Sequence, residues 1–160
     1  MSLDDLRALA TDHIKFIEYS QLAKMTFDDL WAEGPRVIVL LNIINKNHRE
    51  PVGHWITLLK FPDYVEHFDP YGLTIDQELA FTHDKPLLGS LLRGHTVVEN
   101  RTRLQKFREN VNTCGRWAVV RANKYPMNLH DFKKWIHDIP CEPDVAITLL
   151  TTKPGGVSSI

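Results

Sequence analysis

Cys114, in the segment NTCGRW, is the side chain of this sequence best suited to nucleophilic chemistry. The apolar residues of 114–124 follow a helical pattern, which predicts a helix that begins at or beside this cysteine. The positive end of the helix dipole and the unpaired N–H groups there stabilise a thiolate. The backbone N–H of Cys114 would also hold the oxyanion formed when the sulfur attacks a carbonyl. The alternative is a packing cysteine, because free cysteine is among the most buried residue types.

His54 and Asp69 are a base and an orienting acid that a hairpin would bring together. Segments 54–61 and 64–68 have strand patterns, and the Pro-Asp pair between them is typical of a tight turn. Each arm is about seven residues long, so the start of the first strand lies beside the end of the second. An aspartate there accepts a hydrogen bond from the imidazole and fixes its tautomer. Taken singly, each has an ordinary explanation: a surface or core histidine, and an Asp-Pro turn.

Gln105 lies nine residues before Cys114 and is a candidate second donor to the oxyanion. A solvated surface glutamine is the alternative, and Asn110 and Asn112 are competing donors. Cys141 has no base partner in the sequence and is interpreted as structural. The histidines other than His54 show no spacing typical of metal ligands, so the sequence predicts neither a metal nor a cofactor.

The elements that must position these residues mix strands and helices without strict alternation, which predicts an α+β domain. The run RVIVLLNI at 36–43 is typical of a buried central strand. We expect further strands at 54–61, 64–68 and 95–101, and we favour a strand over a short helix at 145–152. We expect helices at 3–10, 25–31 with Thr26 as N-cap, 74–81, 86–93, 114–124 and 129–139.

The bulk composition is that of one ordinary globular domain. The chain has 160 residues, of which 43% are hydrophobic and 24% charged, and we expect a single domain over 1–152 with a flexible tail at 153–160. The net charge of −1 gives no indication of nucleic acid. Apolar runs are too short to span a membrane, and the polar, acidic N-terminus does not resemble a signal peptide. Two cysteines cannot form a disulfide scaffold, which favours a reducing compartment.

The order of these parts carries a resemblance to a known superfamily. The sequence motifs GHW, FDPYG and NTCGRW, in that order, resemble the adenovirus-endopeptidase and SUMO-protease superfamily of cysteine proteases over residues 36–124. Papain runs Cys before His, so the order here is that of the permuted group. The segment from CGRW to the last predicted element resembles the adenain-like proteases of large DNA viruses, virophages and related mobile elements more than cellular deSUMOylases.

The resemblance implies a papain-like fold of the permuted type, with a central mixed sheet flanked by helices and the nucleophile at a helix N-terminus. It implies His54 as base, Asp69 as orienting acid, Cys114 as nucleophile and Gln105 as oxyanion-hole donor. The gap from Gln105 to Cys114 is a few residues longer than is usual in the family. The SUMO proteases have Asp at the acid position, as here, whereas the adenovirus enzyme has Glu.

The predicted function is a cysteine endopeptidase that cleaves viral or virophage capsid or polyprotein precursors, at Gly-Gly-type sites by resemblance. Its partners are a protein or peptide substrate, with a peptide activator left open, and its place is the host cytoplasm or the virion. Gly155-Gly156 in the tail is a candidate self-processing site. Two alternatives remain, an isopeptidase that removes ubiquitin-like modifiers and a catalytically silent binding module of the same fold.

Overall fold

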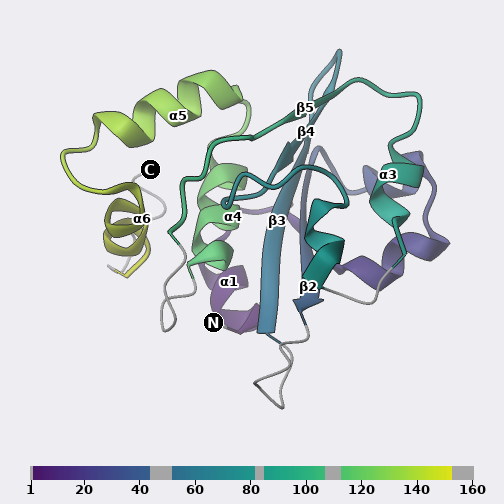
Figure 1. The fold of residues 1–160 in the computed structure, drawn as a ribbon, viewed down its shortest axis with the longest axis horizontal. Helices are drawn as coiled ribbons and strands as arrows, with labels where there is room; N and C mark the ends of the chain where they lie inside the picture. Colours follow the sequence, from purple (N-terminus) through teal and green to yellow (C-terminus); the bar gives the residue numbers. More distant parts are fainter. Residues whose placement is uncertain (1, 44–51, 82–84, 107–112, 153–160) are drawn as a thin grey trace.

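A five-stranded mixed sheet forms the centre of the molecule, with helices on both sides (Figure 1). The computed structural model describes residues 2–43, 52–81, 85–106 and 113–152. The strands are β1 (Lys15–Glu18), β2 (Arg36–Ile43), β3 (Val52–Lys60), β4 (Val65–Phe68) and β5 (Val97–Glu99). They lie side by side in sequence order; β1 is parallel to β2, β2–β3–β4 are antiparallel, and β5 is parallel to β4. The α+β prediction with a central mixed sheet is therefore confirmed.

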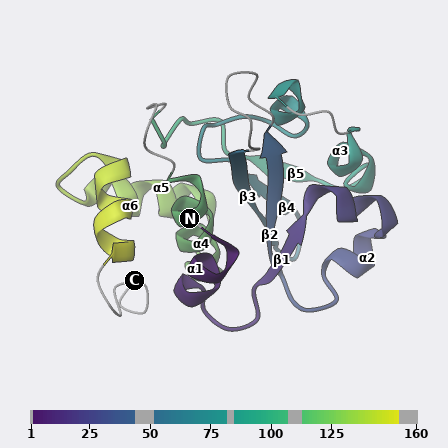
Figure 2. The same ribbon diagram turned by 90° about the horizontal axis from the view of Figure 1, so that it is seen from below.

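The helices divide into two groups, one on each side of the sheet (Figure 2). The elements are α1 (Leu3–Leu9), η1 (Tyr19–Lys24), α2 (Phe27–Leu30), η2 (Gln77–Phe81), α3 (Leu87–Leu91), α4 (Cys114–Asn123), α5 (Leu129–Asp138) and α6 (Pro143–Thr152). In both views α1, α4, α5 and α6 lie on one side and α3 on the other, and Figure 2 shows α2 on the side of α3. In the described ranges no helix has the length and apolarity needed to span a bilayer.

The central strands are buried on both faces, which explains why RVIVLLNI is almost continuously apolar. Alternate residues of β2 enter different cores: Val37 and Val39 pack with η1, α2 and α3, whereas Ile38 packs with α1 and α4. A third cluster joins α4 to α5 and α6 around Trp117 and Phe132. The helix that begins at Cys114 is therefore held from two sides, by the sheet and by the last two helices.

A buried ion pair fixes the rotation of α4 against the sheet. Arg121 of α4 donates from Nε and Nη2 to the two carboxylate oxygens of Glu66 on β4, each at 2.7 Å. Both side chains have no exposed surface. Two parallel hydrogen bonds between planar groups restrict orientation as well as distance. This pair therefore restricts the direction in which α4 presents its first residues.

Most predicted elements are confirmed near their expected bounds. The strand at 36–43 is confirmed, and Thr26 caps α2 by accepting from the backbone N–H of Asp29. The hairpin is also confirmed, with Phe61 N–H bonded to the Tyr64 carbonyl across its turn. The elements expected at 74–81, 86–93 and 95–101 are shorter, as η2, α3 and β5. The tail 153–160, with Gly155-Gly156, lies outside the described residues.

The preference for a strand at 145–152 was wrong, because these residues belong to helix α6. Its β-branched residues suggested a strand, but Pro143 suits the first position of a helix, where no N–H bond is lost. The hydroxyls of Thr148 and Thr151 bond carbonyls one turn earlier. Ala146 and Ile147 are buried against α4 and α5, so packing outweighs the weak β preference.

Candidate active site

Cys114 is the first residue of α4, as the sequence predicts. Its side chain lies next to the start of β3, with Sγ 3.8 Å from the carbonyl oxygen of Gly53. Gly115 allows this approach, because a Cβ there would lie 2.9 Å from Leu6 and 3.1 Å from Trp55. The sulfur therefore sits at the junction of a helix N-terminus and the strand that carries the candidate base.

His54 links the sulfur to the acid. Its Nε2 lies 2.8 Å from Oδ2 of Asp69, and its side chain is also hydrogen-bonded to Cys114. Since Nε2 is directed at the carboxylate, Nδ1 is the ring nitrogen left for the sulfur. The three side chains are almost fully buried, with exposed fractions of 1% for Cys114, 2% for His54 and 0% for Asp69. They form a continuous row from thiol to imidazole to carboxylate.

The charged form of His54 is strongly favoured. Burial by itself would lower the pKa of His54, but the hydrogen bonds and charges of Asp69 and Cys114 outweigh it and raise that pKa to about 10. Burial likewise opposes ionisation of Asp69, yet His54 and neighbouring donors hold the pKa of this carboxyl below its usual value. The row therefore favours an imidazolium at His54 beside the Asp69 carboxylate.

Asp69 reaches His54 diagonally across the end of the hairpin. In the β3–β4 register Thr57 faces Phe68, so Asp69 falls two positions away from direct pairing with His54. Diagonal neighbours of this kind remain within reach of long side chains. Oδ1 of Asp69 accepts the backbone N–H of Tyr71 at 2.8 Å, which leaves Oδ2 for the histidine. The predicted meeting of the two residues is found, although not as directly opposed partners.

Tyr71 is a site residue that sequence analysis missed. Its ring stacks on the ring of His54 with centroids 5.3 Å apart and planes inclined by 25°. Its hydroxyl lies 3.1 Å from the carboxamide oxygen of Gln105. Burial raises the pKa of Tyr71 to about 12, with Cys114 and Asp69 adding to the rise. The signal in the sequence was its place in the FDPYG turn, two residues after the acid.

Gln105 lies beside the N-terminus of α4, where the prediction placed it. The neighbouring donors orient its carboxamide so that Oε1 accepts from the N–H groups of Thr113 and Cys114, each at 3.1 Å. Its own backbone N–H bonds the carbonyl of Pro70 at 2.9 Å, so the acid turn also positions the glutamine. In this conformation the glutamine accepts the Cys114 N–H, and a donor role requires a half-turn of the carboxamide.

Gly72 lets the acid turn approach the segment that carries Gln105. Its φ is +77°, and a Cβ there would lie 2.9 Å from the Thr102 carbonyl carbon and 3.0 Å from the Arg103 nitrogen. We expect Gly72→Ala to lower the free energy of unfolding by about 2–4 kcal/mol, from left-handed strain plus a backbone clash. Denaturant unfolding measures this loss.

Gly94→Ala is the matched control, because Gly94 has φ +85° but no atom within 4 Å of an added Cβ. It carries the backbone strain without the clash, so we expect it to lose only about 1–2 kcal/mol. Equal losses in the two variants would show that the close approach at Gly72 contributes nothing.

Asp144 is a second residue that sequence analysis missed. From the first turn of α6 it accepts three hydrogen bonds, from the Thr113 hydroxyl at 2.8 Å, the Trp117 indole at 2.8 Å and the Lys106 backbone N–H at 2.7 Å. It thereby ties the residue before Cys114 to the residue after Gln105. No local pattern marks it, because its partners lie 27 to 38 positions away in the chain.

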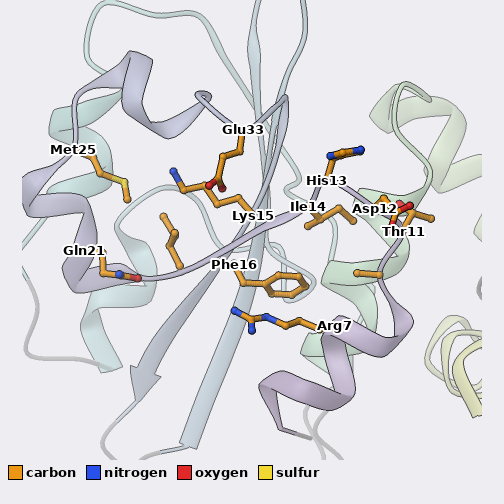
Figure 3. Close-up of a pocket in the computed structure, with 12 residues that line it drawn as sticks. Arg7, Thr11, Asp12, His13, Ile14, Lys15, Phe16, Gln21, Met25 and Glu33 are labelled. Atoms are coloured by element: carbon orange, nitrogen blue, oxygen red, sulfur yellow. The ribbon is translucent and has the colours of Figure 1, made fainter.

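Cys141 and a hollow near the N-terminus lie apart from the row. Cys141, interpreted as structural, is an exposed free thiol. An open hollow of about 570 Å³ lies near α1 and β1, and the Arg7 guanidinium covers Phe16 beside it (Figure 3). None of His54, Asp69 and Cys114 lines it. Within the described ranges no group of three or more His, Cys, Asp or Glu side chains is arranged to hold a metal ion.

The chain is similar in sequence to a viral protein. No family model matches the sequence. The central domain of the uncharacterized Lpg1148 protein from Legionella pneumophila is 15% identical, with a TM-score of 0.47 and 94% of each chain covered. Uncharacterized protein V9 of Sputnik virophage is 30% identical over 165 residues, which span 92% of this chain and 91% of V9. At this identity and coverage, the chain belongs to the same family as protein V9 of Sputnik virophage.

Proposed function

We propose that this protein is a cysteine endopeptidase whose nucleophile is Cys114. The observation that carries the proposal is the buried row in which His54 lies between Asp69, at 2.8 Å, and the Cys114 side chain. The β3–β4 hairpin brings His54 and Asp69 together, whereas Cys114 comes from the start of α4, far from both in the sequence. A nucleophile, a base within hydrogen-bond reach and a group that orients the base are the parts of a nucleophilic hydrolase site.

The proposed reaction is acyl transfer through a thioester. The Cys114 thiolate forms a bond to the scissile carbonyl carbon, and the carbonyl electrons move to oxygen. The tetrahedral intermediate then breaks its C–N bond, and the His54 imidazolium gives its proton to the departing amine. Neutral His54 next removes a proton from water, whose oxygen attacks the thioester. Breaking the C–S bond releases the carboxylic acid and restores the starting pair.

The low exposure of Cys114 and the position of Gln105 describe a resting state in this proposal. With Oε1 of Gln105 accepting from the Cys114 N–H, the place of an oxyanion is filled. Substrate would therefore have to turn the carboxamide so that Nε2 and the Cys114 N–H both point at the oxyanion. The resting hydrogen bonds of Gln105 are then broken only when hydrogen bonds to the charged oxygen replace them.

Gln105→Glu separates the two roles of the glutamine. The carboxylate keeps acceptors for the Thr113 and Cys114 N–H groups, but it has no donor and repels an oxyanion. We expect thermal stability near that of the wild type and a loss of about 10²- to 10³-fold in kcat/KM. Gln105→Ala is the companion variant, expected to lose both stability and activity. Full activity in Gln105→Glu would contradict the donor role.

The substrate class is proposed from the resemblance of GHW, FDPYG and NTCGRW to the adenain-like and SUMO-protease superfamily and from the virophage relative. The proposed substrates are viral or virophage precursor proteins, and the proposed fold type is the permuted papain-like one. An isopeptidase acting on ubiquitin-like modifiers is the alternative within the superfamily. Gly-Gly substrates presented as short peptides and as folded modifier fusions separate the two, because only the isopeptidase requires a folded modifier.

Thiol alkylation tests the proposal against a catalytically silent module. The exposed Cys141 would react in any case, so all measurements use a Cys141→Ser background. We expect iodoacetamide to modify Cys114 at neutral pH at least about ten times faster than in the same protein with His54→Ala, because imidazolium stabilises the thiolate. Equal rates with and without His54, together with no cleavage of any substrate in the panel, would refute the enzyme proposal.

A further inference from the structure

Thr113, the N-cap residue of α4, does not cap the helix with its side chain. An N-cap threonine usually accepts a backbone N–H of the first helical turn with its hydroxyl oxygen. Here the hydroxyl lies 2.8 Å from Oδ1 of Asp144 and 3.2 Å from Oε1 of Gln105. Thr113 is only 4% exposed, so protein groups rather than bulk water set the direction of its hydroxyl. This hydroxyl therefore connects Asp144 with the glutamine beside the nucleophile.

The hydroxyl has one hydrogen for these two acceptors, and Asp144 receives it. The contact with Asp144 is the shorter of the two, and a carboxylate is a stronger acceptor than a carboxamide oxygen. The Trp117 indole donates to the same Oδ1 at 2.8 Å, and the Lys106 backbone N–H donates to Oδ2 at 2.7 Å. Donors at both oxygens favour the ionised form of Asp144. The Thr113 oxygen therefore faces Gln105 as a hydrogen-bond acceptor.

We propose that Asp144 is a positioning residue that keeps the Thr113 hydroxyl oriented as an acceptor for Nε2 of Gln105. With the carboxamide turned, Nε2 donates one hydrogen to the Thr113 oxygen and has the other left for the oxyanion. Without Asp144, the hydroxyl would donate to Oε1 of Gln105 and stabilise the resting conformation instead. The inference rests on the proposed function for its catalytic meaning, whereas the direction of the hydroxyl is a property of the protein itself.

The position of Asp144 suits this role better than that of its charged neighbour Glu142. Asp144 is 8% exposed, and its three hydrogen bonds join α6 to the start of α4 and to the residue after Gln105. Glu142 pairs with Nζ of Lys106 at 2.7 Å, but both of these side chains are about half exposed. Exposed ion pairs of this kind contribute little to stability. Glu142→Gln therefore removes a nearby charge at small cost and is the matched control.

The test compares kcat for cleavage in four forms of the full chain: the wild type, Thr113→Val, Asp144→Ala and the double variant. Thr113→Val removes the acceptor for Nε2 of Gln105, and we expect kcat to fall roughly 3- to 10-fold. Asp144→Ala also lets the hydroxyl donate to Oε1, so we expect a fall of about 10- to 100-fold. In the double variant this hydroxyl is gone, so kcat should rise above that of Asp144→Ala. Two losses that merely add would indicate structural damage alone and would overturn the inference.

Thr113→Ser retains the hydroxyl and is the rescue variant, expected to recover most of the loss seen in Thr113→Val. Glu142→Gln should keep the kcat of the wild type. Circular dichroism verifies that each variant is folded. If Asp144→Ala is not folded, the comparison of Thr113→Ser with Thr113→Val carries the test, and equal kcat in these two variants would overturn the inference.

Proton NMR follows the direction of the hydroxyl without any substrate. The buried hydroxyl proton of Thr113 is assigned by its absence from Thr113→Val. Because a hydrogen bond to a carboxylate moves a proton signal downfield, we expect an upfield shift in Asp144→Ala and no shift in Glu142→Gln. A signal that stays in place in Asp144→Ala would overturn the inference. A signal that follows Asp144 in a protein that cleaves no substrate of the panel would overturn the proposed function alone.

Discussion

Replacement of Cys114 by alanine is expected to abolish cleavage of any substrate found for this protein, with a loss of at least about 10⁴-fold in kcat/KM. The side chain supplies the atom that bonds the scissile carbonyl, and no neighbouring group in the described row can replace it. His54 and Asp69 lie 2.8 Å apart and retain each other in the variant, so the fold and the base remain while the nucleophile is absent.

The stability of this variant must be measured, since the thiol is 1% exposed and packs with Leu6 and Trp55. Removing one buried sulfur leaves a small cavity and is expected to cost about 1 kcal/mol, far less than the loss of activity. Cys141→Ala is the matched control, because this cysteine is exposed and outside the row; we expect it to retain full activity. Cleavage by Cys114→Ala at a rate near that of the wild type would show that the nucleophile lies elsewhere.

Asp69→Asn is expected to lower kcat/KM by roughly 10- to 150-fold, which corresponds to one charged hydrogen bond of about 1.5–3 kcal/mol. Asparagine offers a single carbonyl oxygen for two present donors, the Tyr71 N–H and His54 Nε2. One of them must lose its partner, and the imidazolium loses the negative charge that stabilises it. The effect is smaller than that of Cys114→Ala because the nucleophile and the base both remain.

The same variant should change the pH dependence of activity. His54 must be protonated to release the amine, and its pKa of about 10 predicts that activity falls as pH rises through about 10. Without the Asp69 charge the imidazolium is less stable, so the alkaline limb of kcat/KM should move to lower pH. Asp138→Asn, an exposed carboxylate on α5, is the control expected to leave the limb in place. A limb at the same pH in Asp69→Asn would contradict the assignment of Asp69 as the orienting acid.

Folding stability should decrease with rising pH, as activity does. The pKa of His54 is raised above its ordinary value of 6.5, to about 10. Its contribution to the free energy of unfolding is therefore fully present below pH 6.5 and is lost as pH rises through about 10. Thermal unfolding of the wild type and of Asp69→Asn across this window measures that contribution independently of any substrate.

The residues of the row could be predicted from the sequence because each is marked by a local signal. The helix pattern after Cys114 places this residue at a helix start, and a helix forms from contacts three and four residues apart. The turn between the two strands fixes the hairpin, and a hairpin brings the start of β3 near the end of β4 whatever surrounds it. These elements are short-range, so the sequence alone determines the parts and their order.

Only the tertiary structure decided how those parts are held. Tyr71 stacks on His54, Asp144 joins Thr113 to Lys106, and Glu78 pairs with His67. These contacts join different elements, so no periodicity or turn signal marks them. Residues 145–152, expected as a strand, belong to helix α6 for the same reason, because packing on α4 and α5 outweighs a local preference of a few tenths of a kcal/mol per residue. Local signals in the sequence thus determined which candidate residues and elements this protein has, and long-range packing decided the orientation and charge of those residues.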